Sequence, residues 1–169
     1  MASPVYCTPG RAYHDRFNIE KEPIDSNRFG YIVQVDPYDP NSMPIKRTAL
    51  GRFAHEGANV VINADGREVA YNRDDSRFEY LYKFVSAGNY DLKDRAANMH
   101  LLDDGTLYVA RFNKYGSLNW LSLIHGQGML TTANDFNSHA DVRIRTHQAA
   151  DRVGAMPMDQ PKNVEPNWK

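Results

Sequence analysis

The sequence predicts a mainly β fold of antiparallel strands with a helix near the C-terminus. Three observations support this fold class. Short runs alternate apolar and polar residues with a period of two, as half-buried strands do. Turn signals rich in Asp, Asn and Gly separate these runs, which is typical of hairpins. A helical period begins only after Ser138.

The predicted strands follow one another as antiparallel neighbours. Residues 30–36 alternate in the manner of a buried strand and end at a Pro-rich turn cluster. Residues 47–62 form the next strand, and 67–71 return beside it. Between them, Asn-Ala-Asp-Gly at 63–66 predicts a tight turn, because Asp-Gly tolerates positive φ. Further strands are expected at residues 77–85, 106–112 and 117–124, the last two joined by a turn at 113–116.

Aromatic and charged residues divide between the two faces of the strand at 77–85. The aromatic face holds Phe78, Tyr80, Tyr82 and Phe84. The opposite face holds Arg77, Glu79 and Lys83, with Leu81 and Val85. This charged face fits either a solvated charge ladder or a set of ligands. Elsewhere, Tyr108 and Trp120 are expected in the core.

A helix is predicted from Ser138, where Asp141 three residues later resembles a capping box. Gly154 and Pro157 supply its stop signal. Asp151 near its end is expected to be an exposed charge. The predicted buried stripe of this helix comprises Val142, Thr146, Ala149, Ala150 and Val153.

Two segments lack a sustained period. Residues 1–28 are polar and rich in Pro and Gly, which predicts an irregular lead-in. Residues 86–100 are expected to form a loop with a short helix. The single cysteine, Cys7, has no intramolecular disulfide partner and is expected to be a free thiol.

Composition excludes several classes of partner. The formal net charge is −1, from 20 basic and 21 acidic residues spread along the chain, which argues against nucleic acid and anionic membranes. A mean hydropathy of −0.64 and the lack of a long apolar run argue against a transmembrane helix. The N-terminal residues carry no export signal.

Glu56 lies in the middle of a mostly apolar face of the strand at 47–62. A buried carboxylate is costly unless a cation or donors compensate its charge. Either Arg52, two positions away on the same face, pairs with Glu56, or a metal ion does. Gly57 permits a bulge at this point.

The runs around Glu56 and Glu79 carry a family resemblance. Arg-Thr-Ala-Leu-Gly-Arg-Phe-Ala-His-Glu-Gly-Ala at 47–58 and Asp-Asp-Ser-Arg-Phe-Glu-Tyr-Leu-Tyr-Lys-Phe at 74–84 resemble the PhoX (DUF839) family of secreted alkaline phosphatases. Further runs fall in the family's order, at residues 29–37, 105–113 and 149–159.

The resemblance implies a multi-bladed β-propeller, of which residues 29–169 would form a partial domain of about two to three blades. It also implies a periplasmic or secreted phosphatase that hydrolyses phosphomonoesters with calcium and iron. Because family members are much longer, the chain is expected to be an internal fragment that is inactive alone until the missing blades complete it. Its exposed strand edges would permit self-association.

Hard cations require carboxylate ligands, so the metal ligands expected from the resemblance are Glu56, Glu79, Asp74 and Asp75. In a propeller, loop ends and inner strands point to the central channel, where these side chains could converge. His55 alternates to the opposite face of the strand from Glu56 and is expected to be structural, or to support a ligand.

The chain departs from the family near its end. Where the family has Met-Asp-Arg-Pro-Glu, residues 158–162 read Met-Asp-Gln-Pro-Lys. The resemblance implies that this arginine of the family contacts the substrate phosphate and that this glutamate is a metal ligand. Gln160 cannot offer a charged fork, and Lys162 would repel cations, so weakened metal assembly and no confident catalytic residue are expected.

Two other functions fit the same residues. The first is a non-catalytic segment of a propeller that binds calcium or associates with other blades. The second is a lactonase-like hydrolase on a similar propeller, which would also use calcium and carboxylates. The long runs around Glu56 and Glu79 favour the phosphatase family over the lactonase.

Overall fold

The computed structural model describes residues 9–161 and 164–166 and divides into two compact units, Met1–Gly30 and Tyr31–Lys169. The first unit contains short 3-10 turns and no strand among its described residues. The turn residue Asp25 is bound by Arg16 at 3.3 Å and by Arg28 at 3.1 Å. These turns are Pro9–Ala12, Asp15–Phe17 and Asp25–Arg28. Cys7 lies outside the described residues.

The second unit is built on a five-stranded antiparallel sheet with strand order β3-β4-β6-β7-β8. Its strands are β3 (His55–Ile62), β4 (Arg67–Asp74), β6 (Leu81–Asn89), β7 (Gly105–Phe112) and β8 (Leu118–Ser122). Two small sheets accompany it. They pair β1 (Ile32–Gln34) with β2 (Ile45–Arg47), and β5 (Arg77–Glu79) with β9 (Met158–Asp159). The predicted mainly antiparallel β class is therefore confirmed.

The predicted hairpins form where the turn chemistry places them. Asn63 and Gly66 close the turn between β3 and β4, and Gly66 has a φ of 85°. Asn113 and Gly116 close the turn between β7 and β8 in the same way. The short helix expected in the loop after β6 is α1 (Arg95–Asn98), capped by the side chain of Asp94.

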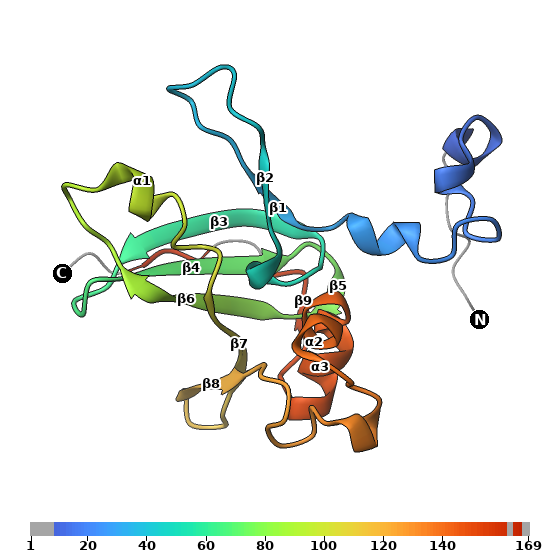
Figure 1. Ribbon diagram of the computed structural model, residues 1–169. Coiled ribbons are helices and arrows are strands. Elements are labelled where there is room, and N and C mark those ends of the chain that lie inside the picture. Colours follow the sequence, from blue (N-terminus) through green and yellow to red (C-terminus); the bar gives the residue numbers. More distant parts are fainter. Residues whose placement is uncertain (1–8, 162–163, 167–169) are drawn as a thin grey trace. The chain divides into compact units, whose positions relative to one another are not determined.

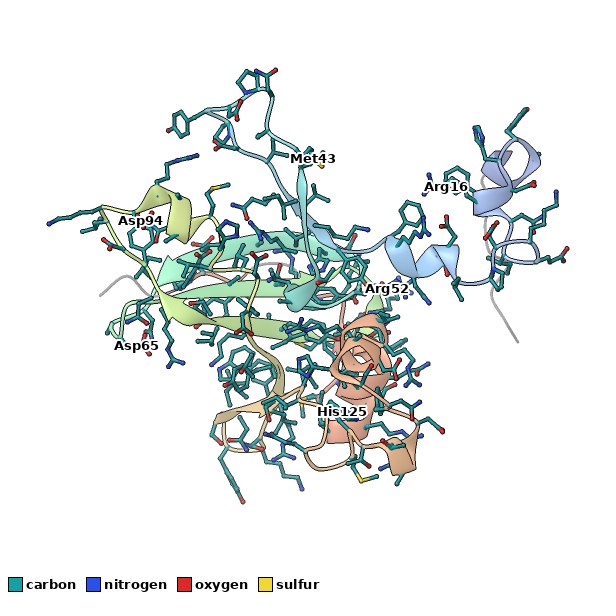
Figure 2. The ribbon with its side chains drawn as sticks, in the orientation of Figure 1. Arg16, Met43, Arg52, Asp65, Asp94 and His125 are labelled. Atoms are coloured by element: carbon teal, nitrogen blue, oxygen red, sulfur yellow. The ribbon has the colours of Figure 1, made fainter. Side chains whose placement is uncertain are left out.

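One face of the sheet forms the core, against α2 (His139–Ile144) and α3 (Thr146–Val153). Both helices lie near β5 and β9 (Figure 1), and side chains fill the space between them and the sheet (Figure 2). The cross-strand set Ala70, Phe84 and Leu107 is almost fully buried on this face. The helices contribute Val142, Ala149 and Ala150.

The prediction of one strand over residues 47–62 was wrong. A 3-10 turn at Thr48–Leu50 and Gly51, with a φ of 83°, separate β2 from β3. The turn directs Leu50 into the core, so packing overrides the alternating pattern. β3 is an edge strand, and its apolar residues Val60 and Ile62 are nearly half exposed. The strand at 30–36 is also shorter than predicted, and Val33 in β1 is exposed rather than buried.

The prediction of one strand over residues 77–85 was also wrong, because the chain bends at Phe78. This residue has a φ of 65° and is 72% exposed, so it leaves the aromatic face. Tyr80, Tyr82 and Phe84, the rest of the predicted aromatic face, are buried. The break separates β5 from β6 and turns Glu79 toward α3, where it lies 3.7 Å from His147.

The predicted C-terminal helix is divided in two at Arg145. Thr146 explains the break, because its hydroxyl donates to the Arg143 carbonyl at 2.7 Å and accepts from the Arg52 amide at 2.9 Å. These bonds compete with the helical ladder. The predicted cap is present, with Ser138 accepting from the Asp141 amide, and Gly154 ends α3 with a φ of 76°.

Tyr108 and Trp120 were predicted to lie in the core, but they lie on the outer face of the sheet. They flank the ammonium of Lys83, which lies 5.2 Å from the Tyr108 ring and 4.5 Å from the Trp120 ring. Among the described residues, no helix has the length and apolar character needed to cross a membrane.

Candidate functional site

Three side chains that can bind metal meet where the end of β4 faces α3. Asp74 is the last residue of β4 and is fully buried, Glu79 ends β5, and His147 lies in the first turn of α3. Each offers one ligand atom, and these atoms all lie within 4.8 Å of one another. The bend at Phe78 and the start of α3 at Thr146 therefore build this cluster.

His147 links the two carboxylates. Its Nε2 forms a hydrogen bond with Asp74 Oδ2, and its Nδ1 lies 3.7 Å from Glu79 Oε1. The hydrogen bond to Asp74 is the main cause that raises the pKa of His147, although burial opposes it. Burial is the main cause that raises the pKa of Glu79. The charge of His147 lowers that pKa, and the nearby Asp74 and Asp151 raise it again.

Two buried tyrosines border the cluster. The Tyr80 hydroxyl donates to Asp151 Oδ1, and burial together with this carboxylate raises the pKa of Tyr80. Tyr82 is fully buried, and its pKa is raised by burial first and then by Glu79 and Asp74. Asp151 is exposed as a residue, as the sequence predicts, but one of its oxygens is held by Tyr80.

Several polar atoms of the cluster are buried without a hydrogen-bond partner. Among the described residues these include Asp74 Oδ1, Glu79 Oε2 and the Tyr82 hydroxyl. A buried oxygen without a donor carries a desolvation cost of roughly 1–3 kcal/mol, and more when it is charged. Oxygen-rich sites with uncompensated negative charge suit cations, so this donor set fits a metal ion.

Glu56 lies elsewhere, on the other face of the sheet. Its carboxylate is 3.5 Å from Arg73 Nε. Arg73 and Asp74 are successive residues of β4 and therefore point to opposite faces. The structure thus does not bring Glu56 to Asp74 and Glu79. The predicted compensation for Glu56 was Arg52 or a metal ion, whereas the guanidinium found beside it here is that of Arg73.

The bulge expected at Gly57 is present. The register between β3 and β4 shifts between His55 and Ala58, and Gly57 has a φ of 67°. A Cβ at Gly57 would lie 2.5 Å from Arg73 Nη1, so the glycine also makes room for the guanidinium. Gly57 therefore fixes the place where Glu56 and Arg73 meet.

Asp75 does not join the cluster either. It is exposed, and its Oδ1 accepts a hydrogen bond of 2.7 Å from Gln160 Nε2. Gln160 follows β9 and has a φ of 55°. Lys162 lies outside the described residues.

His55 points to the core face, opposite Glu56. Its ring packs on Phe53 with a centroid distance of 3.7 Å, and Nε2 lies 3.1 Å from the Gly51 carbonyl oxygen. Burial is the main cause that lowers its pKa. These contacts are those of a structural residue.

His147 is the residue of the cluster that was not predicted from the sequence. It is 73 positions from Asp74, and no local motif joins the two. One signal was available, since His147 and Asp151 are four residues apart and share a face of the predicted helix.

Comparison with known proteins identifies the family. The family model for alkaline phosphatase PhoX matches residues 4–169. A solved structure of Pseudomonas fluorescens PhoX, in complex with the transition state analogue vanadate, superposes with a TM-score of 0.85 at 43% identity. No curated protein matches.

The match to the Pseudomonas structure covers 88% of this chain and 27% of that one, so this chain spans about a quarter of its length. The likeness extends through the sheet and confirms the expectation of antiparallel strands that form part of a β-propeller. With 43% identity over this span and a family model that matches almost the whole sequence, the chain belongs to the PhoX alkaline phosphatase family.

Proposed function

We propose that this chain is part of a PhoX-like alkaline phosphatase that hydrolyses phosphomonoesters with calcium and iron. The observation that carries the proposal is the family match over residues 4–169. The vanadate bound by the Pseudomonas relative, described as a transition state analogue, supports phosphoryl transfer as the reaction class. The family also supports a periplasmic or secreted location.

The carboxylates proposed as cation ligands are Glu56, Asp74, Asp75 and Glu79. The unpartnered oxygens of Asp74 and Glu79 support this role. Glu56 would exchange its ion pair with Arg73 for a cation. When bound, calcium and iron would polarise the phosphoryl oxygens and neutralise the charge that develops on them.

The chain's own residues would orient these ligands. Gly57 places Glu56 at a bulge, and Gln160 holds Asp75 by a neutral hydrogen bond. Because an amide lacks the charge and the two-pronged geometry of arginine, Gln160 would bind a phosphate more weakly than the family's arginine does. We therefore expect low turnover.

Hydrolysis of a generic aryl phosphate, with calcium and iron added, tests the proposal. We expect little or no turnover from this chain alone, and the double variant Gln160→Arg/Lys162→Glu should increase it. Glu56→Gln should abolish this turnover. The matched control Glu68→Gln, at a partly buried glutamate of β4, should not. Turnover that is unaffected by Glu56→Gln would contradict the role of Glu56.

The alternative is a non-catalytic segment that binds calcium or associates with other chains. This chain covers only 27% of the Pseudomonas chain, which supports a segment that binds or associates without catalysing. Calcium that raises the melting temperature, with no turnover in the double variant, would support this alternative and contradict the phosphatase activity.

A further inference from the structure

We propose that Asp74, Glu79 and His147 form a site for one divalent transition ion of the Zn²⁺ or Mn²⁺ type, which this chain completes with its own residues. The inference rests on the proposed function only in treating Asp74 and Glu79 as cation ligands. It adds a nitrogen ligand to these two carboxylates and assigns them a transition ion in place of calcium. The ion class and the role of His147 are new.

The first argument is geometric. Ligands at about 2.0–2.2 Å from a tetrahedral zinc ion lie roughly 3.3–3.6 Å from one another. His147 Nδ1 and Glu79 Oε1 are already 3.7 Å apart, and the three residues can place one ligand atom each within 4.8 Å. To close the set around one ion, His147 and Asp74 would give up their hydrogen bond, because Asp74 and Glu79 now contact different nitrogens of the ring.

The second argument is the state of the buried polar groups. Asp74 is 0% exposed, yet Oδ1 has no hydrogen-bond partner among the described residues. The Tyr82 hydroxyl, also in a residue that is 0% exposed, is without a partner and is influenced by both Glu79 and Asp74. A fully buried hydroxyl that donates to neither of the carboxylates whose charges act on it is costly unless another group occupies the site.

The third argument is charge. Asp74, Asp151 and His147 are the charged groups that act on Glu79. With Glu79 itself, these make three carboxylates and a single imidazole, so the carboxylates outnumber the imidazole. Asp74 is fully buried and Glu79 is partly buried, and holding their charges there is unfavourable without a compensating cation.

The donor set selects the class of ion. Calcium prefers six to eight oxygen ligands, whereas imidazole together with carboxylates suits zinc, manganese and related ions. In the metal-free chain, the hydrogen bond between His147 Nε2 and Asp74 fixes the orientation of the ring. Asp74 would exchange this bond for the ion, because one carboxylate cannot support the ring from its far nitrogen and ligate the same ion.

Calorimetric titration of the full 169-residue chain with Zn²⁺, Mn²⁺ and Ca²⁺, in a buffer without phosphate or chelators, tests the inference. We expect one Zn²⁺ per chain, bound at least roughly tenfold more tightly than Ca²⁺. Glu79→Gln and His147→Gln should each weaken Zn²⁺ binding at least roughly tenfold.

The control is His100→Gln. His100 forms a comparable pair with an aspartate, at 2.9 Å from Asp103, but it is exposed and lies outside the cluster. Its replacement should leave Zn²⁺ binding unchanged. Glu79→Gln keeps the Asp74–His147 bond, and circular dichroism of the metal-free variant checks that it folds.

Some outcomes would overturn the inference. These are an absence of Zn²⁺ binding, tighter binding of Ca²⁺ than of Zn²⁺, or Zn²⁺ binding that survives both Glu79→Gln and His147→Gln. Aryl phosphate turnover measured on the same samples separates the two proposals. Zn²⁺ binding without turnover supports the site and contradicts the phosphatase activity, whereas turnover without a Zn²⁺ site does the reverse.

Discussion

Replacing Gly57 by alanine tests how the chain positions Glu56. Gly57 has a φ of 67°, where a side chain costs about 1–2 kcal/mol. The new Cβ would also lie 2.5 Å from Arg73 Nη1, so the guanidinium must move away from Glu56. The Arg73 side chain is only 13% exposed, but Glu56 is 36% exposed, so solvent screening limits the lost ion pair to about 1 kcal/mol. We expect a total loss of about 2–3 kcal/mol in the free energy of unfolding.

The matched control for this variant is Gly116→Ala. Gly116 has a φ of 78° in the turn between β7 and β8, and a Cβ there meets nothing within 4 Å. Gly116→Ala should therefore lower the free energy of unfolding only by the backbone cost of about 1–2 kcal/mol. Urea unfolding followed by circular dichroism measures both losses.

A double-variant cycle then isolates the contact with Arg73. In an Arg73→Ala background, the extra loss caused by Gly57→Ala should disappear, because nothing remains for the Cβ to displace. If Gly57→Ala costs no more than Gly116→Ala, or if its extra cost persists without Arg73, the reasoning about this bulge is refuted.

Three further predictions concern contacts outside the cluster. Gly105→Ala should destabilise the chain by about 2–4 kcal/mol, because its Cβ would lie 2.3 Å from a backbone carbonyl oxygen of β6. Gly88→Ala, which meets only a flexible leucine side chain at 3.2 Å, should stay within about 1 kcal/mol in the same urea titration. Arg47→Met should cost about 2–4 kcal/mol, because the fully buried guanidinium donates to a glutamine side chain, an aspartate and a backbone carbonyl. Arg95→Gln should lower the melting temperature at pH 7 but not at pH 2. Hydrogen bonds from Arg95 lower the pKa of Asp36, so their stabilisation is present above the unfolded carboxyl pKa of about 4 and is lost as the pH falls through the lower folded value. An equal effect of Arg95→Gln at both pH values would contradict that pairing.

The parts of the fold that the sequence predicted correctly are those set by neighbouring residues. Asp65 and Gly66 specify a turn that joins β3 to β4, and Ser138 and Gly154 bound the helical segment. Each of these signals acts within a few residues and needs no knowledge of the tertiary fold.

The errors arise where distant contacts override the local pattern. Gly51 breaks the long strand because Leu50 packs in the core, and Thr146 divides the helix by bonding to the amide of Arg52, which is 94 residues away. Phe78 leaves the aromatic face because β5 pairs with β9 instead of continuing into β6. Alternation along a strand contains no information about these partners.

The residues of the candidate site also differ in whether neighbouring or distant residues place them. Asp74 and Glu79 are close in sequence, so their convergence could be anticipated from the acidic loop. His147 could not be paired with them, because only the packing of α3 on the sheet brings it within bonding distance of Asp74. Glu56 lies apart from them for a geometric reason, since a strand alternates its faces and Glu56 meets Arg73 rather than Asp74.

Glu56 is separated from Asp74 and Glu79 by the sheet, and this affects how the proposed cations could bind. A cation bound at Asp74 and Glu79 would lie on the helix side of the sheet, among residues that this chain supplies by itself. A cation bound at Glu56 would lie on the opposite side, where the carboxylate is now paired with the guanidinium of Arg73. Ions of the two sites therefore need not bind together. Loading of the first should proceed in the Glu56→Gln variant, whereas loading of the second requires Arg73 to release Glu56 and needs further oxygen ligands.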